Sequence, residues 1–442
     1  MGRPVRLPIA LAACLLLLAT ASAMAVGAVS LTADGPYYLV RILGTDDLLT
    51  TNARLFGNAL RQAPVLLAAR SGLTETYALS VLLGVGQIVL PAVVWSVAVV
   101  LSRASLLAFA AVTMTAALSA GMTWLANVSE SVLALPLTVL VAVLLWQPRP
   151  WRPGHAVLAV AASVVLVASY ESALVTGAML ATWSVWRARA STAHSDRWGG
   201  AAVAVTSALS MAVAVGGALT GKGSTNAQSS LYFMASGDPW PFYVAFLSAL
   251  LLLAALAVRN DALRWTLLVL GGVATVLAVS GWTATPAVSF QARGGAAMAA
   301  SLAVLFLWAL WIRERLPSAH DTGRSGGGAW LVVVPVAFVA ALTLASLGGV
   351  ARWTCSIDAF RTQVDRAKGV VPEDEVLPAD RRLVVWDWTS SSLSLIVRQE
   401  PGAGILVDRS PSWTPFPPAA ARTQLGDEYT WRATDWPATC VW

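Results

Sequence analysis

The sequence predicts an all-α polytopic membrane protein with about eleven transmembrane helices and a small extracytoplasmic α/β domain at its C-terminus. Of its 442 residues, 57% are hydrophobic and only 12% are charged, whereas a soluble domain carries about 25% charged residues. The apolar residues gather in runs long enough to cross a bilayer, which takes roughly 17–25 residues. From about residue 351 the composition changes to polar and charged residues with many Trp and Pro. These three observations set the fold class.

Most of the apolar runs have the length of a single span. They lie at about 7–30, 76–101, 104–125, 131–147, 198–219, 239–258, 262–282, 295–312 and 328–349. The first run follows Arg3 and Arg6 and ends in an Ala-rich stretch that resembles a signal-peptidase site. We expect this run to remain in the protein as an uncleaved first helix.

The run from about 155 to 186 is different, because it is too long for one span and is broken near its middle by polar residues. Basic residues flank it on both sides, with Arg149 and Arg152 before it and Arg187 and Arg189 after it. Lys and Arg concentrate in cytoplasmic loops, so both flanks belong on one side. Two short helices that form a hairpin satisfy this condition. The chain then has eleven spans in the inner (plasma) membrane of a bacterial cell, with its N-terminus in the cytoplasm and its C-terminus outside.

The formal net charge of +6 does not indicate nucleic-acid binding. Most basic residues lie in short loops between apolar runs, where they orient a membrane protein. Carboxylates show the opposite distribution, since nearly all of them lie in the predicted outer loops or in the tail. The three histidines are scattered on the predicted cytoplasmic side, so we expect neither a metal site nor a histidine-based catalytic triad.

Two domains follow from this pattern: a transmembrane domain over 1–350, whose first outer loop covers 31–75, and an extracytoplasmic domain over 351–442. Within the tail, 357–368 has helical spacing, and the apolar runs 383–386 and 404–407 are predicted strands. Its tryptophans could stack on sugar rings, but such residues more often fill a small core or lie at the membrane interface.

Two cysteines, Cys355 and Cys440, bracket the tail. Disulfides persist outside the cytoplasm, so we expect a Cys355–Cys440 bridge that closes this domain. A pair of free thiols is the alternative.

The first outer loop carries an unusual concentration of charge. Asp34 follows the first span in "ADGPYYL", where a Gly-Pro turn should hold it near the interface, and Asp46 and Asp47 come later in the loop. A helix after them is predicted to be amphipathic and to lie at the interface, with Arg54 and Arg61 away from its apolar face. Those arginines would bind lipid phosphates or would extend toward the headgroups.

More ionisable residues are predicted on the same side of the membrane, and such residues near a membrane are functional candidates. They are Glu130 before the fourth span, Glu171 at the top of the hairpin, Lys222 in the loop before the run 239–258, and Arg293 before the run 295–312. Together with the aspartates of the first outer loop, we expect these side chains to converge on one outer cavity.

At these residues the chain resembles the GT-C superfamily of membrane glycosyltransferases. "ADGPYYL" resembles the family's acid-then-tyrosine pattern after the first span, with Asp34 as the acid and Tyr37 or Tyr38 as the aromatic residue. "NVSES" resembles the family's second acidic position, at Glu130. Gly35 stands where many members have a second acid, so the catalytic residue stays open between Asp34 and the later aspartates Asp46 and Asp47.

The resemblance implies transfer of a sugar from a polyprenyl-phosphate-linked donor to a glycan or lipid acceptor of the cell envelope. The transfer would be inverting and metal-independent or weakly metal-dependent, so a divalent metal ion stays open as a cofactor. Asp34 would take the acceptor proton, with Glu130 as a second acid. Arg293 and Lys222 would stabilise the departing phosphate.

The remaining candidates would bind substrate or line the route of the lipid donor: Tyr37, Arg54, Arg61 and Glu171. Two other functions stay open. A flippase for lipid-linked sugars predicts ionisable residues at mid-membrane and two similar halves. A non-enzymatic protein that binds the cell envelope predicts that the tail alone binds glycan.

Overall fold

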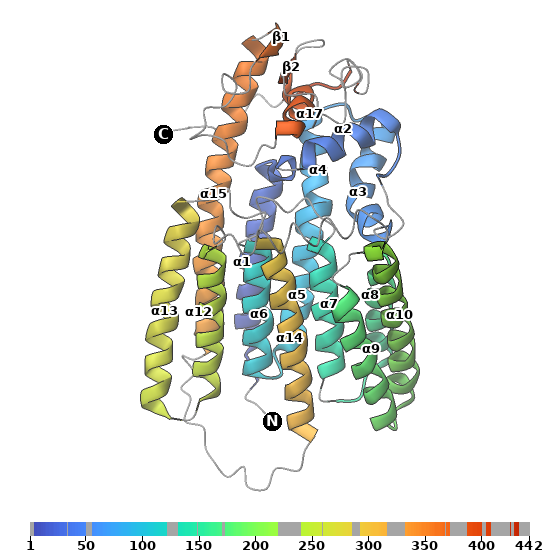
Figure 1. Cartoon of the computed structure of the whole chain (residues 1–442), viewed down its shortest axis with the longest axis vertical. Coiled ribbons are helices and arrows are strands. Elements are labelled where there is room, and N and C mark those ends of the chain that lie inside the picture. Colours follow the sequence, from blue (N-terminus) through green and yellow to red (C-terminus); the bar gives the residue numbers. More distant parts are fainter. Residues whose placement is uncertain are drawn as a thin grey trace.

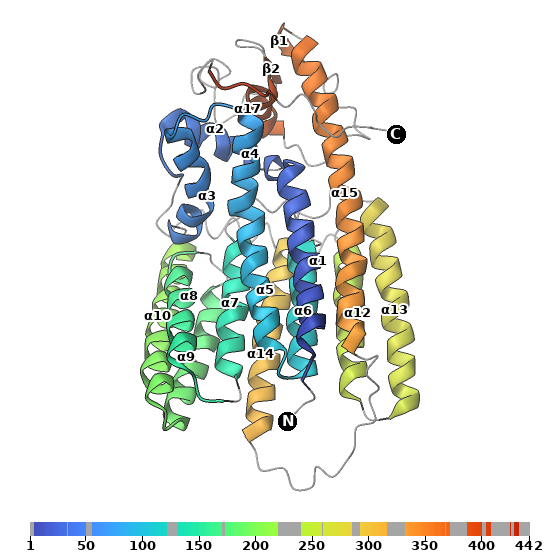
Figure 2. The same ribbon diagram turned by 180° about the vertical axis from the view of Figure 1, so that it is seen from behind.

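The protein is a bundle of long helices with a group of shorter elements at one end (Figure 1). The computed structural model describes residues 4–32, 34–49, 55–121, 131–147, 149–169, 173–219, 240–258, 260–284, 292–315, 332–366, 368–371, 387–399, 404–407, 425 and 428–432. We call the end of the bundle at which the chain begins the N-terminal end. The opposite end, where α2, α3 and α17 lie, is the tail end (Figure 2).

The described helices of the bundle run up and down between these two ends. They are α1 (Leu7–Val26), α4 (Thr76–Gly84), η3 (Val85–Val89), α5 (Leu90–Ser102), α6 (Leu106–Gly121), α7 (Ser131–Trp146), α8 (Pro153–Leu166), α9 (Ala173–Ala190), α10 (His194–Leu219), α12 (Trp240–Ala257), α13 (Asp261–Ala284), α14 (Ala292–Arg315) and α15 (Val333–Arg366). The tail-end elements are η1 (Val29–Leu31), α2 (Gly35–Thr45), α3 (Leu55–Arg70), β1 (Lys368–Val371), α17 (Asp387–Val397) and β2 (Gly404–Val407).

Seven described helices are long and apolar enough to cross a membrane, counting α4, η3 and α5 as one. They agree with seven of the predicted runs, so the multi-pass membrane character is supported. The apolar helices α6, α7 and α8 have 16, 16 and 14 residues, shorter than a typical span of about 20 residues. The predicted number of eleven spans is therefore not confirmed.

The long run around residue 170 does form two helices, α8 and α9, as expected. The start of α8 lies beside the end of α9. The Arg187 guanidinium, near the end of α9, donates hydrogen bonds to the carbonyl oxygens of Gln147 and Arg149, just before α8. At the other end, the Ala168 carbonyl accepts a hydrogen bond of 3.2 Å from the Phe56 N–H of α3. The two basic flanks therefore lie at the N-terminal end, and Ala168, after the last turn of α8, lies beside the start of α3, which agrees with the predicted hairpin.

The second predicted span is one continuous helical segment whose middle winds as a π-helix, η3. The π-helix lies between Gly84 and Pro91, which is in the first turn of α5. It packs against α1, α3 and α5. Short π-helical turns of this kind within α-helices are frequent at functional sites, and here residues 85–89 pack directly against α3.

The tail differs from the predicted arrangement. Helix α15 continues without a break through residue 351, where the boundary between two domains was expected. The predicted strand at 404–407 is confirmed as β2, which pairs in parallel with β1, Lys368 opposite Gly404. Residues 383–386 lie outside the described residues. The described part of the tail thus holds one strand pair and α17, packed against α2, α4 and α15, and a separate α/β domain is not confirmed.

Cys355 lies within α15 and is disulfide-bonded, whereas Cys14 is a free, buried cysteine. Cys440 lies outside the described residues, so its pairing with Cys355 stays a prediction.

Candidate functional site

The predicted first outer loop, residues 31–75, begins with a tight turn that contains Asp34. Asp34 is half-buried and precedes α2, whose first turn contains Pro36, and its carbonyl accepts a hydrogen bond of 3.0 Å from the Tyr38 N–H. Its side chain does not cap the helix. The rings of Tyr37 and Tyr38 meet edge to face with centroids 6.0 Å apart. The acid and the two aromatic residues of "ADGPYYL" thus lie together at the start of α2.

The two later aspartates lie in an exposed turn at the other end of α2. Asp46 has a left-handed backbone (φ 50°), and its Oδ1 accepts a hydrogen bond of 3.0 Å from the Nε of Arg70. Both side chains of this ion pair are more than half exposed, so the pair contributes at most about 1 kcal/mol to stability. The Oδ1 of Asp47 accepts the N–H of Leu48 at 2.7 Å. These contacts hold the turn, which favours a structural role for Asp46 and Asp47.

On helix α3, the apolar side chains point outward as expected, but the arginine side chain points inward. Its apolar side chains Leu55, Phe56 and Leu60 are exposed, as the predicted apolar face requires. Arg61, however, is fully buried at 0% exposure. The prediction that Arg61 extends toward lipid headgroups is therefore wrong. Burial of a guanidinium is costly unless polar groups surround it, and the inward face of α3 supplies them.

The inward face of α3 carries three buried polar side chains: Asn58, Arg61 and Gln62. Arg61 donates a hydrogen bond of 3.2 Å from its Nη2 to Asn58 Oδ1. Gln62 donates to the carbonyl of Leu49 at 3.0 Å and accepts the Leu49 N–H at 2.8 Å. Gln62 therefore fastens the turn that contains Asp46 and Asp47 onto α3.

One residue at this site was not among the predicted candidates. Gln87, in η3, is 0% exposed, and neither its Oε1 nor its Nε2 has a hydrogen-bond partner among the described residues. The neighbouring Gly86 lies directly against the backbone of Arg61. A sequence signal was present, because Gln87 is the one polar amide within the apolar run 76–101. Buried amides in proteins are nearly always hydrogen-bonded, to protein groups, ordered water or ligands, which makes Gln87 a candidate for binding a polar group.

The tail segment 428–432 packs against the start of α4. Glu75 accepts the N–H groups of Tyr77 and Ala78 at the start of α4, and it also accepts the Arg432 N–H at 2.9 Å. Trp431 is buried against the ring of Tyr77, with centroids 5.2 Å apart. This tail tryptophan therefore fills a core, as expected for most of them.

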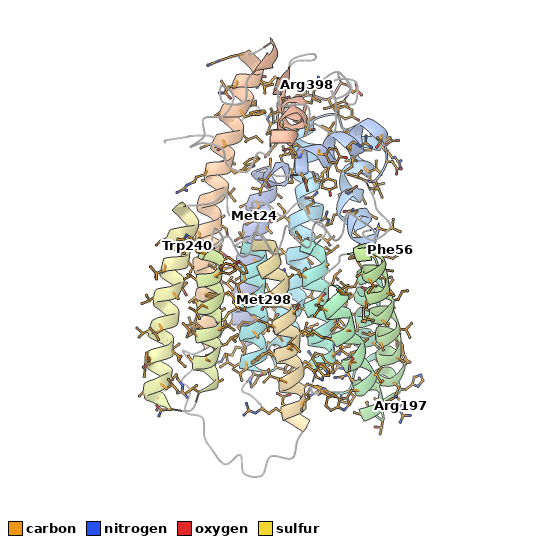
Figure 3. The ribbon with its side chains drawn as sticks, in the orientation of Figure 1. Met24, Phe56, Arg197, Trp240, Met298 and Arg398 are labelled. Carbon is orange, nitrogen blue, oxygen red and sulfur yellow. The ribbon has the colours of Figure 1, made fainter. Side chains whose placement is uncertain are left out.

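Tyr429 connects the tail to the exposed turn of α2. Its pKa lies above the ordinary value, first because of its burial, then because of the negative charges of Glu428 and Asp46. The tail segment 428–432, the turn at Asp46 and the start of α4 thus form one surface at the tail end, where Figure 3 also places Arg398 after α17.

Several predicted site residues lie outside the described residues: Arg54, Glu130, Glu171 and Lys222. Arg293 lies in the first turn of α14, and only its backbone is described. The predicted convergence on one cavity therefore stays a prediction. Within the described part of the chain, no group of three His, Cys, Asp or Glu residues lies close enough to hold a metal ion, so we derive no step through a metal.

Comparison of the chain with family models, with curated proteins and with solved structures gives no match.

Proposed function

We propose that this chain is a membrane glycosyltransferase that moves a sugar from a polyprenyl-phosphate donor to a cell-envelope acceptor at its tail end. One observation carries the proposal most. The acid of "ADGPYYL" and the buried cation of α3 both lie at the tail end, on elements that pack against each other (Figure 1). Sugar transfer from a lipid phosphate needs a carboxylate and a cation at one end of the membrane domain.

The proposed orientation has the N-terminal end in the cytoplasm. Exposed arginines concentrate there. Arg197 lies at this end (Figure 3), Arg6 directly precedes α1, and the Arg103 carbonyl accepts the N–H of Val5 near the start of the chain. This agrees with the excess of basic residues in cytoplasmic loops. The tail end is then extracytoplasmic. With α6, α7, α8 and α9 as additional spans, the chain has the eleven spans of the prediction.

In the proposed reaction, Asp34 takes the proton of the acceptor hydroxyl as that oxygen bonds to the sugar carbon. The bond from the sugar to the donor phosphate breaks at the same time, and the polyprenyl phosphate leaves with its electron pair. Arg61 is the proposed cation that stabilises the leaving phosphate, because a buried guanidinium interacts strongly with a developing charge. Asp46 and Asp47 are less suited to act as the base, since their oxygens are occupied in an exposed turn.

The outward face of α3 supports a lipid donor. Phe56, Leu60 and Leu67 are between 39% and 65% exposed, and they lie on the same helix as Arg61. Apolar side chains outside and a cation inside match a lipid phosphate, whose chain stays in an apolar environment while its headgroup enters a polar one. Glu130, Glu171, Lys222 and Arg293 remain proposed parts of the same site.

A flippase is the less favoured function. It needs ionisable residues near the middle of the membrane. Among the described residues, the buried charged side chains lie at or near helix ends or in tail-end elements: Arg61, Arg187, Asp196, Arg264 and Arg398.

Purified full-length protein is to be incubated with radiolabelled polyprenyl-phosphate sugars and membrane lipid acceptors. Labelled product supports the proposal, and labelled donor that crosses vesicle membranes without transfer supports a flippase instead.

A further inference from the structure

Four exposed arginines lie at one corner of the N-terminal end, where the loop between α7 and α8 meets the turn between α9 and α10. Arg149 and Arg152 come from the loop, Arg189 lies in the last turn of α9, and Arg197 lies in the first turn of α10. We call these four residues the arginine patch. Figure 3 shows Arg197 at this end of the molecule.

A buried network joins the two segments that carry the patch. Arg187 and Asp196 form an ion pair of 3.0 Å whose side chains are 0% and 2% exposed. Arg187 also donates to the Arg149 carbonyl at 3.0 Å, and Asp196 accepts the Trp151 N–H at 3.0 Å. Arg149 belongs to this network through its backbone carbonyl. The other three patch arginines lie one or two positions from a residue of the network. The network holds together the two backbone segments that carry the four arginines.

The same network removes the acid from this surface. The segments 140–165 and 175–215 together contain a single carboxylate, Asp196. This residue is buried. The turn between α12 and α13 at the same end is different, because there Arg264 pairs at 2.7 Å with the exposed Asp261. The arginine patch is thus a surface of four positive charges without an exposed carboxylate beside them in these segments.

Two exposed tryptophans flank the patch. Trp186, before Arg187, is 43% exposed, and Trp198, after Arg197, is 38% exposed. Tryptophan is enriched at the depth of the lipid headgroups, because its ring is apolar and its N–H is polar. The two exposed indoles agree with a position of the patch at headgroup depth.

We propose that the arginine patch binds the phosphate groups of anionic phospholipids, such as phosphatidylglycerol or cardiolipin, in the leaflet at the N-terminal end. Guanidinium groups bind phosphate oxygens through paired hydrogen bonds. Basic clusters between transmembrane helices on the cytoplasmic side bind such headgroups. The four charges, the buried acid and the flanking indoles together fit an anionic lipid. The proposal goes beyond sugar transfer and does not depend on it.

Native mass spectrometry of the full-length protein in detergent tests this directly. The protein is titrated with phosphatidylglycerol or with zwitterionic phosphatidylcholine of the same acyl chains. The patch variant carries Arg189→Gln and Arg197→Gln and keeps the buried ion pair. The matched control carries Arg352→Gln and Arg366→Gln, two exposed positions of α15 outside the corner. Thermal unfolding of each variant shows that the fold is retained.

The wild type is expected to bind phosphatidylglycerol more tightly than phosphatidylcholine. The patch variant loses roughly 30-fold in affinity for phosphatidylglycerol, as follows from the effect of two surface arginines on an anionic lipid, and the control keeps the wild-type affinity. Equal binding of the two lipids by the wild type, or an equal loss in the control, overturns the proposal. Displacement of phosphatidylglycerol by an equal concentration of inorganic phosphate also overturns it, because the patch would then be a site for free phosphate.

Discussion

The backbone carbonyl of Arg61, on α3, lies directly against Gly86 in the π-helix η3, so closely that a Cβ atom at position 86 would overlap it. This approach brings the backbone of α3 at Arg61 next to the segment that carries Gln87. Glycine alone permits it, because any side chain needs the space that the Arg61 backbone occupies. The contact therefore fixes the position of α3, and with it the proposed cation, relative to the membrane bundle.

Gly86→Ala is expected to destabilise the protein by about 1–3 kcal/mol, because the added methyl group collides with backbone that cannot rotate away. Thermal unfolding in detergent measures the change. Gly272→Ala in α13 is the matched control, since a Cβ atom there meets nothing within 4 Å. Alanine favours a helix over glycine by up to about 1 kcal/mol, so the control should be unchanged or slightly stabilised. Equal effects in the two variants would show that α3 does not lie against η3.

Gln87→Leu is expected to leave the stability unchanged or to raise it, and to lower sugar transfer. The buried amide of Gln87 has no partner among the described residues, so an apolar side chain of similar size removes a desolvation cost. A ligand that binds the amide would lose its contact. Thermal unfolding and a transfer assay on the same preparation separate the two effects. A destabilised variant with full activity would mean that Gln87 has a structural role only.

Asp196→Asn is expected to destabilise the protein by roughly 3–5 kcal/mol, because it leaves the Arg187 guanidinium buried without its counter-charge. Urea or thermal unfolding measures the loss. Asp46→Asn breaks an ion pair that is more than half exposed and should cost less than about 1 kcal/mol. A similar cost for both substitutions would contradict the burial of the Arg187–Asp196 pair.

The pKa of Tyr429 gives a test of the contact between the tail and α2. It is raised above the ordinary value of about 10, so the folded protein holds the phenol proton more tightly than the unfolded chain does. The contribution of Tyr429 to stability is complete below pH 10 and is lost as the pH rises through the pKa of the folded state.

Absorbance at 295 nm, compared between the wild type and Tyr429→Phe, isolates this titration. Asp46→Asn removes one negative charge near the phenol, so the pKa of Tyr429 should fall part of the way toward 10, the larger effect of burial being retained. A pKa of Tyr429 that does not change in Asp46→Asn would show that the tail does not lie over this turn.

Much of the membrane bundle was predictable, because long apolar runs with basic flanks report directly on the bilayer. The hairpin of α8 and α9 follows from the length of the run 155–186, from the polar break near its middle and from its basic flanks. The buried position of Arg61 was not predictable in this way. The helical pattern of α3 showed which residues share its apolar face, but whether that face points inward or outward depends on η3, which is distant in sequence.

The tail shows a second limit of sequence reasoning. The change in composition near residue 351 marked where the polar region begins, yet α15 crosses this point because its helical hydrogen bonds do not depend on the solvent outside. Glu75 caps α4 and also accepts a hydrogen bond from the backbone N–H of Arg432. Such a contact joins residues that are far apart in the chain, and no local sequence pattern predicts it.

The most direct test of the account is sugar transfer from a panel of radiolabelled polyprenyl-phosphate sugars by the purified wild type, beside Asp34→Asn and Asp46→Asn. The account predicts that the wild type transfers sugar, that Asp34→Asn folds normally but loses at least about a hundredfold in rate, as expected for a missing general base, and that Asp46→Asn keeps most of the activity. Full activity in Asp34→Asn would contradict the assignment of the base, and no transfer from any donor would contradict the proposed function itself.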